Sequence, residues 1–183
     1  MISRNQTCPT IALAESDPDD ANLLLSTLRH AAPNLNVNVL QNGEEVLQYF
    51  FRTDTRGSTT QQHDTPCDLL LLNLALPKLD GFKVLRQLQW LYREDLTLLP
   101  PMVVLCESDD PEIIANAYRY GAKGFLCKTM DVSQLVHAIE EVVHYWLEVT
   151  LRPKREHPRL PSRLRSWWQL GSPGQAQQEL ALR

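Results

Sequence analysis

Six polar or sulfur-containing residues follow short apolar runs and could together form one reaction centre. They are Glu15, Ser16, Asp17, Asn73, Cys106 and Lys128. A carboxylate nucleophile, acidic neighbours, a hydroxyl and a lysine at such positions would make a magnesium-dependent phosphoryl acceptor, in which metal and lysine neutralise phosphoryl charge. Asn73, which follows four leucines at the centre of the set, is an amide. Whether this chemistry survives therefore depends on residue 73.

Five apolar runs that alternate with amphipathic stretches would position these residues. The predicted strands are 10–14, 37–41, the leucine run at 69–72 that leads into Asn73, 101–106 and 123–127. The predicted helices begin at Asp17-Pro18, Asn42, Gly81, Asp110 and Val132, the last running to about Leu147. This order predicts an α/β fold with a doubly wound, five-stranded parallel sheet, flavodoxin-like, and a C-terminal extension. The carboxyl ends of such strands share one edge, where ligands bind.

Charge and composition divide the chain into three parts. Residues 149–183 hold seven Lys or Arg and two Glu, a net charge of +5. Because the whole chain has a net charge of −4, the other 148 residues have a net charge of −9. We expect an arm at 1–9, a domain at 10–150 that includes a polar loop at 52–66, and a basic tail at 151–183 containing Pro and Trp. Four cysteines without C-x-x-C spacing, and no apolar run near the roughly 18 residues of a membrane span, predict a cytoplasmic protein without disulfides.

Three motifs resemble the receiver domain of two-component response regulators, over roughly residues 9–150. They are E-S-D-P-D-D at 15–20, D-L-L-L-L-N-L-A-L-P-K-L-D-G at 68–81 and G-A-K-G-F-L-C-K at 121–128. The ending His144-Tyr145-Trp146-Leu147, followed by Leu151–Pro153, resembles bacterial phytochrome-associated single-domain regulators. The resemblance implies a signalling module and not an enzyme.

The resemblance also assigns roles that the chain fills only in part. It makes residue 73 the phosphoacceptor, which here is Asn, and residue 16 the second acidic ligand of magnesium, which here is Ser. Of the usual set, Glu15 and Lys128 remain. An amide is not a nucleophile and is a poor ligand for magnesium, which prefers carboxylate oxygen. We therefore expect no catalytic residue, no ordinary aspartyl phosphorylation, metal binding by Glu15 that is weak or absent, and a Lys128–Glu15 ion pair.

The positions that would respond to a phosphoryl group depart as well. Cys106 replaces the Thr or Ser whose hydroxyl follows the phosphoryl group, Phe125 replaces the Tyr switch, and Thr129 replaces the proline of a cis peptide bond. For Cys106 a buried, inert thiol is expected in preference to a redox sensor. The hypothesis is an atypical single-domain response regulator, a pseudo-receiver, that acts by protein–protein contact in a phosphorelay.

The partners implied are a sensor histidine kinase, phytochrome-like in the subfamily that the chain resembles, and a second copy of the chain. The apolar stripe of the last helix is wider than core packing needs, which favours a homodimer. The predicted dimer or partner face contains Tyr118, Phe125, Val132, Val136, Ile139, Val143, Trp146 and Leu147.

An alternative hypothesis makes the chain a dimeric, receiver-based effector whose basic tail binds nucleic acid or an anionic membrane. Leu160, Leu164, Trp167 and Trp168 lie near helical spacing among arginines, which suits such surfaces. Four prolines in the tail favour instead a disordered extension with one local docking element. A phosphatase would need a carboxylate near residue 73, and a nucleotide-binding fold would need a glycine-rich loop after the first strand.

Overall fold

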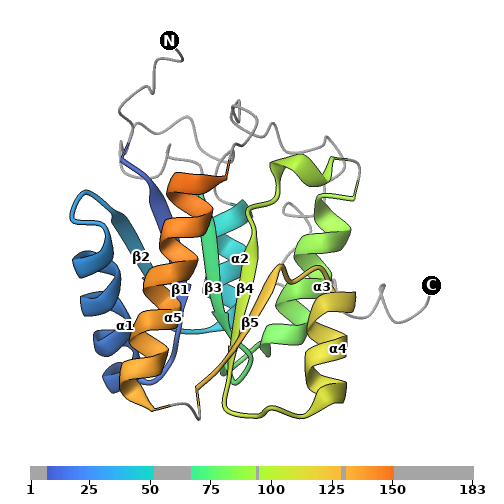
Figure 1. Cartoon of the computed structure of the whole chain (residues 1–183). Helices are drawn as coiled ribbons and strands as arrows, with labels where there is room; N and C mark the ends of the chain where they lie inside the picture. The colour runs from blue at the N-terminus through green and yellow to red at the C-terminus, as the bar shows by residue number, and fades with distance from the viewer. Residues whose placement is uncertain (1–7, 52–66, 94, 129–130, 151–183) are drawn as a thin grey trace, which may run out of the picture.

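One parallel sheet, in the strand order β2-β1-β3-β4-β5, forms the centre of the molecule (Figure 1). The computed structural model describes residues 8–51, 67–93, 95–128 and 131–150. Its elements are β1 Thr10–Ala14, α1 Pro18–Ala31, β2 Asn36–Leu40, α2 Gly43–Phe51, β3 Leu69–Asn73, α3 Gly81–Leu91, β4 Met102–Cys106, α4 Pro111–Arg119, β5 Gly124–Cys127 and α5 Val132–Val143. The predicted five βα units are thus confirmed, with strand boundaries and helix starts moved by at most one residue.

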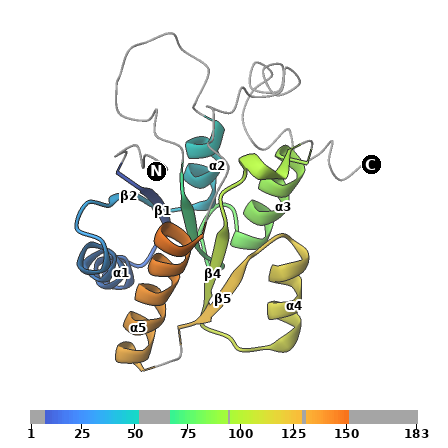
Figure 2. The same cartoon turned by 45° about the horizontal axis from the view of Figure 1, so that its top comes forward.

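Helices cover both faces of the sheet, as Figure 2 shows. Helices α1 and α5 pack on one face, and α2, α3 and α4 pack on the other. In β3 the side chains of Leu69 and Leu71 enter the core beneath α1 and α5. Those of Leu70 and Leu72 enter the core beneath α2, α3 and α4. Because both faces are covered, the leucine strand is apolar throughout and lacks the alternation of a half-exposed strand.

The last helix differs from the single helix predicted over 132–147. The α-helix ends at Val143, and the chain continues as a π-helical segment, η3, from His144 to Val149. Thr150 closes this segment, because its N–H donates to the carbonyl oxygen of Tyr145 at 3.0 Å and its hydroxyl donates to that of Trp146 at 2.9 Å. These bonds satisfy carbonyl groups that a helix end leaves without partners.

Local signals explain how α1 and α3 begin beside the site. The Asp17 side chain accepts from the N–H groups of Asp19 and Asp20, and Pro18 follows it in the first turn, as predicted. At the start of α3, a Cβ on Gly81 would lie 2.7 Å from the carbonyl oxygen of Asn73. Only glycine allows the helix to begin so close to the end of β3.

Several predictions fall outside the described residues: most of the arm at 1–9, the loop at 52–66, the turn at Thr129 and the tail at 151–183. In the part of the chain that the structure describes, no helix is long and apolar enough to cross a membrane.

Candidate functional site

The polar residues predicted from strand ends meet at the carboxyl edge of the sheet, the lower edge in Figure 1. Glu15 directly follows β1 and is only 1% exposed. Its Oε1 accepts from the backbone N–H groups of Ser16 at 2.9 Å and Asp17 at 3.0 Å, and from Asn73 Nδ2 at 2.9 Å. Its Oε2 accepts from Asn73 Nδ2 and from Lys128 Nζ, both at 2.9 Å. Protein donors therefore surround this carboxylate.

The amide of Asn73 is held at both of its ends. Its Nδ2 donates to both oxygens of Glu15, while its Oδ1 accepts from the backbone N–H of Ala75 at 2.9 Å. This backbone donor fixes which end of the amide is the oxygen, because the reverse orientation would place two donors together and leave Glu15 facing an acceptor. At residue 73 the side chain thus donates to a carboxylate, which an ionised aspartate could not do.

Lys128 supplies the positive charge of the site. Its ammonium pairs with Glu15 at 2.9 Å and also with Asp20 on α1, and its side chain is only 5% exposed. Burial lowers the pKa of Lys128, but the hydrogen bonds to Asp20 and Glu15 outweigh burial, so its pKa lies above the ordinary value. The predicted Lys128–Glu15 ion pair is present. The pairing with Asp20 was not predicted, although the place of Asp20 in the first turn of α1, beside the Asp17 cap, was a usable signal.

The residues at this edge do not fit the magnesium ion that the receiver fold implies. The carboxylate of Glu15 is already surrounded by donors, that of Asp17 caps α1, and that of Asp20 pairs with Lys128. Ser16 is exposed, and its hydroxyl donates to the carbonyl oxygen of Ala75 at 3.5 Å. Within the described residues, no cluster of three or more His, Cys, Asp or Glu side chains is arranged to hold a metal. Magnesium prefers several carboxylate and water oxygens in octahedral array.

The two predicted switch positions lie on neighbouring strands. Cys106, the last residue of β4, is half-buried and not fully buried as predicted, and its Sγ accepts from the N–H of Ser108 at 3.5 Å. Phe125 on β5 is half-buried and packs against the core beneath α2, α3 and α4. Cys106 is less buried than predicted because β4 ends there, at the rim of the sheet.

The predicted dimer face needs correction at two positions. Ile139 is 0% exposed and Val143 is 2% exposed, because both point from α5 into the core beneath α1 and α5. The assignment of these two residues to an exposed face is therefore wrong. The remaining predicted residues are all exposed or half-buried, and are here called the α4–β5–α5 face: Tyr118, Phe125, Val132, Val136, Trp146 and Leu147. The last two lie on η3, which continues α5, and pack partly against the core beneath α1 and α5.

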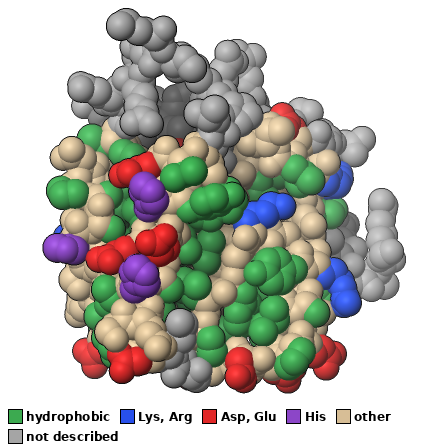
Figure 3. All heavy atoms as spheres, viewed as in Figure 1, with side chains coloured by type: hydrophobic (Ala, Val, Ile, Leu, Met, Phe, Trp, Pro, Cys, Tyr) green, Lys and Arg blue, Asp and Glu red, His purple; other side chains and the backbone are tan. Residues whose placement is uncertain are grey.

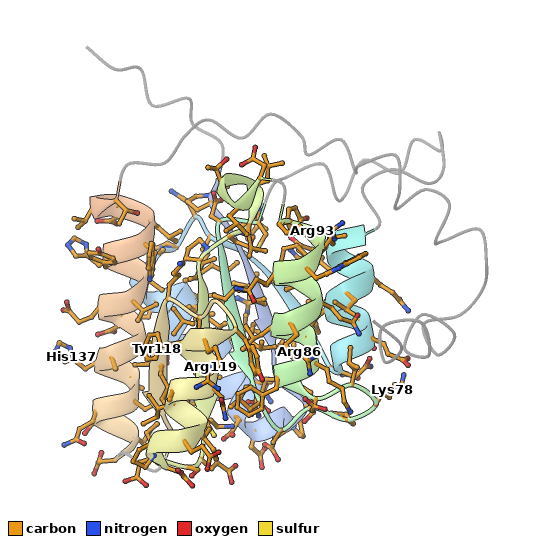
Figure 4. The ribbon with its side chains drawn as sticks, turned by 90° about the vertical axis from the view of Figure 1, so that its right-hand side faces the viewer. Lys78, Arg86, Arg93, Tyr118, Arg119 and His137 are labelled. Atoms are coloured by element: carbon orange, nitrogen blue, oxygen red, sulfur yellow. The ribbon has the colours of Figure 1, made fainter. Side chains whose placement is uncertain are left out.

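The α4–β5–α5 face presents apolar surface to solvent. Tyr118 is 50% exposed and Val132 is 58% exposed on this face, and Tyr145 and Val149 on η3 are exposed as well. Figure 3 shows apolar side chains gathered between α5 and α4, with histidines and acidic groups beside them on α5. Figure 4 shows Tyr118 on the side of α4 that faces α5, whereas Arg86 on α3 lies to the other side.

Comparison with known proteins identifies the family. The response regulator receiver domain model matches residues 11–140, so the chain belongs to the response regulator receiver family. Receivers of this family are regulatory modules of two-component signalling.

The relatives include a regulator named for a phytochrome and one described in red light signalling. The chain is 23% identical over 143 residues to the response regulator Rcp1 of Synechocystis, covering 78% of this chain and 92% of Rcp1. The phosphorylated cyanobacterial phytochrome response regulator RcpA is 27% identical, with a TM-score of 0.67 over 81% of this chain and 100% of RcpA. The response regulator RPA3017, described in red light signalling of R. palustris, is 26% identical, with a TM-score of 0.66 over 80% and 99%. The predicted flavodoxin-like receiver fold is confirmed.

Proposed function

We propose that this chain is an atypical single-domain response regulator that acts by protein contact and is not phosphorylated at residue 73. One observation carries the proposal: the Asn73 amide donates to both oxygens of Glu15, which Lys128 also neutralises. The buried carboxylate of Glu15 thus has its counter-charge and its hydrogen-bond donors within the chain, and the residue at the acceptor position has no negative charge with which to attack phosphorus. Its role is then to hold the receiver in one conformation.

The proposed upstream partner is a sensor histidine kinase of the phytochrome type. The support comes from similarity to RcpA, a phytochrome response regulator by name, and to RPA3017, described in red light signalling. Because residue 73 would not accept a phosphoryl group, the kinase would recognise this receiver as a docking partner and not as a phosphorylation substrate.

The proposed second partner is another copy of the chain, bound through the α4–β5–α5 face. Tyr118 and Val132 are exposed apolar residues of that face, and apolar side chains gather between α4 and α5 in Figure 3. Exposed apolar surface of this kind is typical of interaction sites. The interface would be isologous, with the same patch contributed by both copies.

The test restores the missing carboxylates. The full chain, the Asn73→Asp variant and the double variant Asn73→Asp with Ser16→Asp are each incubated with acetyl phosphate and magnesium. We expect no acid-labile phosphoryl group on the parent chain, little on the single variant, which still lacks a metal ligand, and substantial labelling of the double variant. Stoichiometric phosphorylation of any aspartate in the parent chain would refute the proposal.

A second candidate function rests on the uneven charge. Residues 149–183 carry +5, whereas the rest of the chain carries −9, and a basic segment attracts polyanions. In that case the receiver domain would mediate dimerisation and the tail would bind nucleic acid or anionic lipid. Salt-dependent binding to duplex DNA or to phosphatidylserine vesicles, lost on truncation after residue 150, would favour it. Absence of binding at low salt would exclude it.

A further inference from the structure

Two cysteines stand opposite each other at the carboxyl edge of the sheet. Cys106 is the last residue of β4 and Cys127 is the last residue of β5, and the two are register partners in the parallel β4–β5 pair. Both are half-exposed and carry thiols.

The pairing places both side chains on one face of the sheet. Residues directly opposite each other in a parallel pair project to the same side, and alternate residues of a strand share a side. Cys106 packs against the core beneath α2, α3 and α4, and so does Phe125, which is two residues before Cys127. Cys127 therefore projects toward that same side, next to Cys106.

The spacing of the strands permits a bond between these two thiols. Parallel strands lie about 4.7–4.9 Å apart, inside the Cα separation of about 4.4–6.8 Å that disulfides span. The Cβ separation of roughly 3.5–4.5 Å that a disulfide prefers is shorter than the strand spacing, so the bond would draw the strand ends together. A disulfide under such strain is easily reduced again.

We propose that Cys106 and Cys127 form an oxidation site, a cross-strand dithiol that a peroxide converts reversibly into a disulfide. One thiolate attacks the peroxide oxygen, which gives a sulfenic acid and releases water from hydrogen peroxide. The second thiolate then attacks the sulfenic sulfur, the S–S bond forms, and a second water leaves. The two sulfurs together lose two electrons and two protons, and one peroxide is reduced to two waters. A thiol reductant reverses the change.

The location of the dithiol places this chemistry beside the polar network. The N–H of Lys128, the residue after Cys127, donates to the carbonyl oxygen of Cys106 at 2.7 Å, and the ammonium of Lys128 pairs with Glu15. The proposal does not depend on whether residue 73 accepts a phosphoryl group, because neither thiol takes part in that reaction.

The other two cysteines provide internal controls. Cys67 is 6% exposed and donates to the carbonyl oxygen of Leu69, near the amino end of β3. The register that pairs Ile11 with Leu69 puts Pro9, not the exposed Cys8, opposite Cys67. The chain thus holds one register-matched pair of cysteines and two cysteines that are not matched with each other.

The experiment treats the reduced full-length chain with a slight excess of hydrogen peroxide. Intact-mass measurement and non-reducing peptide mapping follow, with alkylation of the remaining thiols. We expect the mass to fall by two hydrogen atoms, the peptides of Cys106 and Cys127 to be joined, both of these cysteines to resist alkylation, and dithiothreitol to restore the starting mass. The Cys8→Ser/Cys67→Ala double variant should behave identically. The Cys127→Ser variant should lose the intramolecular bond and gain oxygen at Cys106 instead.

Three results would overturn the proposal. One is a disulfide that joins other cysteines. Another is only intermolecular disulfide formation, which vanishes on dilution. The third is full alkylation of both Cys106 and Cys127 after peroxide treatment that oxidises a control dithiol to completion.

Discussion

The carboxyl-edge site and the α4–β5–α5 face handle their side chains in opposite ways. At the site, Glu15 and Lys128 are almost fully buried and each finds a charged or hydrogen-bonded partner within the chain. On the α4–β5–α5 face, Tyr118 and Val132 are half or more exposed and apolar. The site is complete within one chain, whereas the face leaves apolar surface for another molecule to cover.

The contrast shows where the chain keeps its capacity to signal. A buried carboxylate is costly unless a charge and hydrogen bonds compensate it, so the Glu15 network resists change unless its partners are altered together. Apolar surface gains free energy on contact with any complementary partner. We therefore expect substitutions in the network to change stability and substitutions on the face to change association.

The largest effect should come from Lys128→Met. Removing the ammonium leaves Glu15 buried without its counter-charge, which should lower the free energy of unfolding by about 3–5 kcal/mol. Urea denaturation monitored by circular dichroism measures this loss. Lys83→Met is the matched control, because the Lys83–Asp80 pair has the same 2.9 Å separation but is exposed, and such pairs contribute about 1 kcal/mol or less. Equal losses in both variants would contradict the contrast.

The next effect should come from Asn73→Asp without further change. The new carboxylate would replace both Nδ2 donations to Glu15 with repulsion between like charges, which Lys128 offsets only in part. We expect a loss of roughly 2–4 kcal/mol at neutral pH. The loss should shrink as the pH falls and one carboxyl group takes up a proton.

This expectation is tested by measuring the free energy of unfolding of the parent chain and the Asn73→Asp variant between pH 4.5 and about 8. That range spans the titration of a carboxyl group with a raised pKa. The exposed Asn22 on α1 supplies the control, because Asn22→Asp should change stability by less than about 0.5 kcal/mol at any pH. A single variant as stable as the parent at neutral pH would show that the site tolerates a second carboxylate.

An alkaline titration should reveal the Lys128 pairs. Because the folded pKa of Lys128 is raised, its contribution is complete below the unfolded value of about 10.4 and is lost as the pH rises through the folded pKa. Burial also raises the pKa of Tyr49, so the unfolded tyrosine ionises first and adds to the same slope. The measurement is therefore made in the Tyr49→Phe background. The fall in stability with pH should be shallower when Lys128→Met is added, and an unchanged slope would contradict the assignment.

The smallest effect on folding should come from Val132→Glu, which places a charge on the α4–β5–α5 face. Stability should change by less than about 0.5 kcal/mol, while the dimer dissociation constant should rise at least about tenfold, equivalent to 1.4 kcal/mol. Analytical ultracentrifugation measures the second quantity. Leu96→Glu is the control, since Leu96 is 56% exposed but lies outside this face. If the parent chain is monomeric at all concentrations, the proposal of a homodimer is refuted.

Much of the fold could be predicted from the sequence because local signals agreed with one another. The leucine run at 69–72, the Asp17-Pro18 cap and the apolar stripe of α5 each pointed to the element that formed. The inward direction of Ile139 and Val143 was missed, because a helical stripe shows which residues share a face without showing how much of that face the sheet covers. The π-helical end of the last helix was also missed, because no sequence pattern indicates the hydrogen bonds by which Thr150 closes it.

The site was predictable in composition but not in connectivity. Strand ends correctly brought Glu15, Asn73 and Lys128 together, since parallel strands share a carboxyl edge. The second partner of Lys128, Asp20, depended on the angle at which α1 leaves β1. The opposition of Cys106 and Cys127 depended on register between β4 and β5, which strand prediction alone does not provide.

Lys128 also joins parts of the chain that lie far apart in the sequence. Its ammonium ties the end of the last strand to the end of the first strand and to α1, across 113 residues between Glu15 and Lys128. Contacts that close such long loops carry a large entropic cost before they form. The ion pairs of Lys128 with Glu15 and Asp20 should therefore form late in folding. Interactions that form late contribute little to the rate of folding and mainly slow unfolding. In kinetic terms, this one side chain would set the lifetime of the assembled sheet.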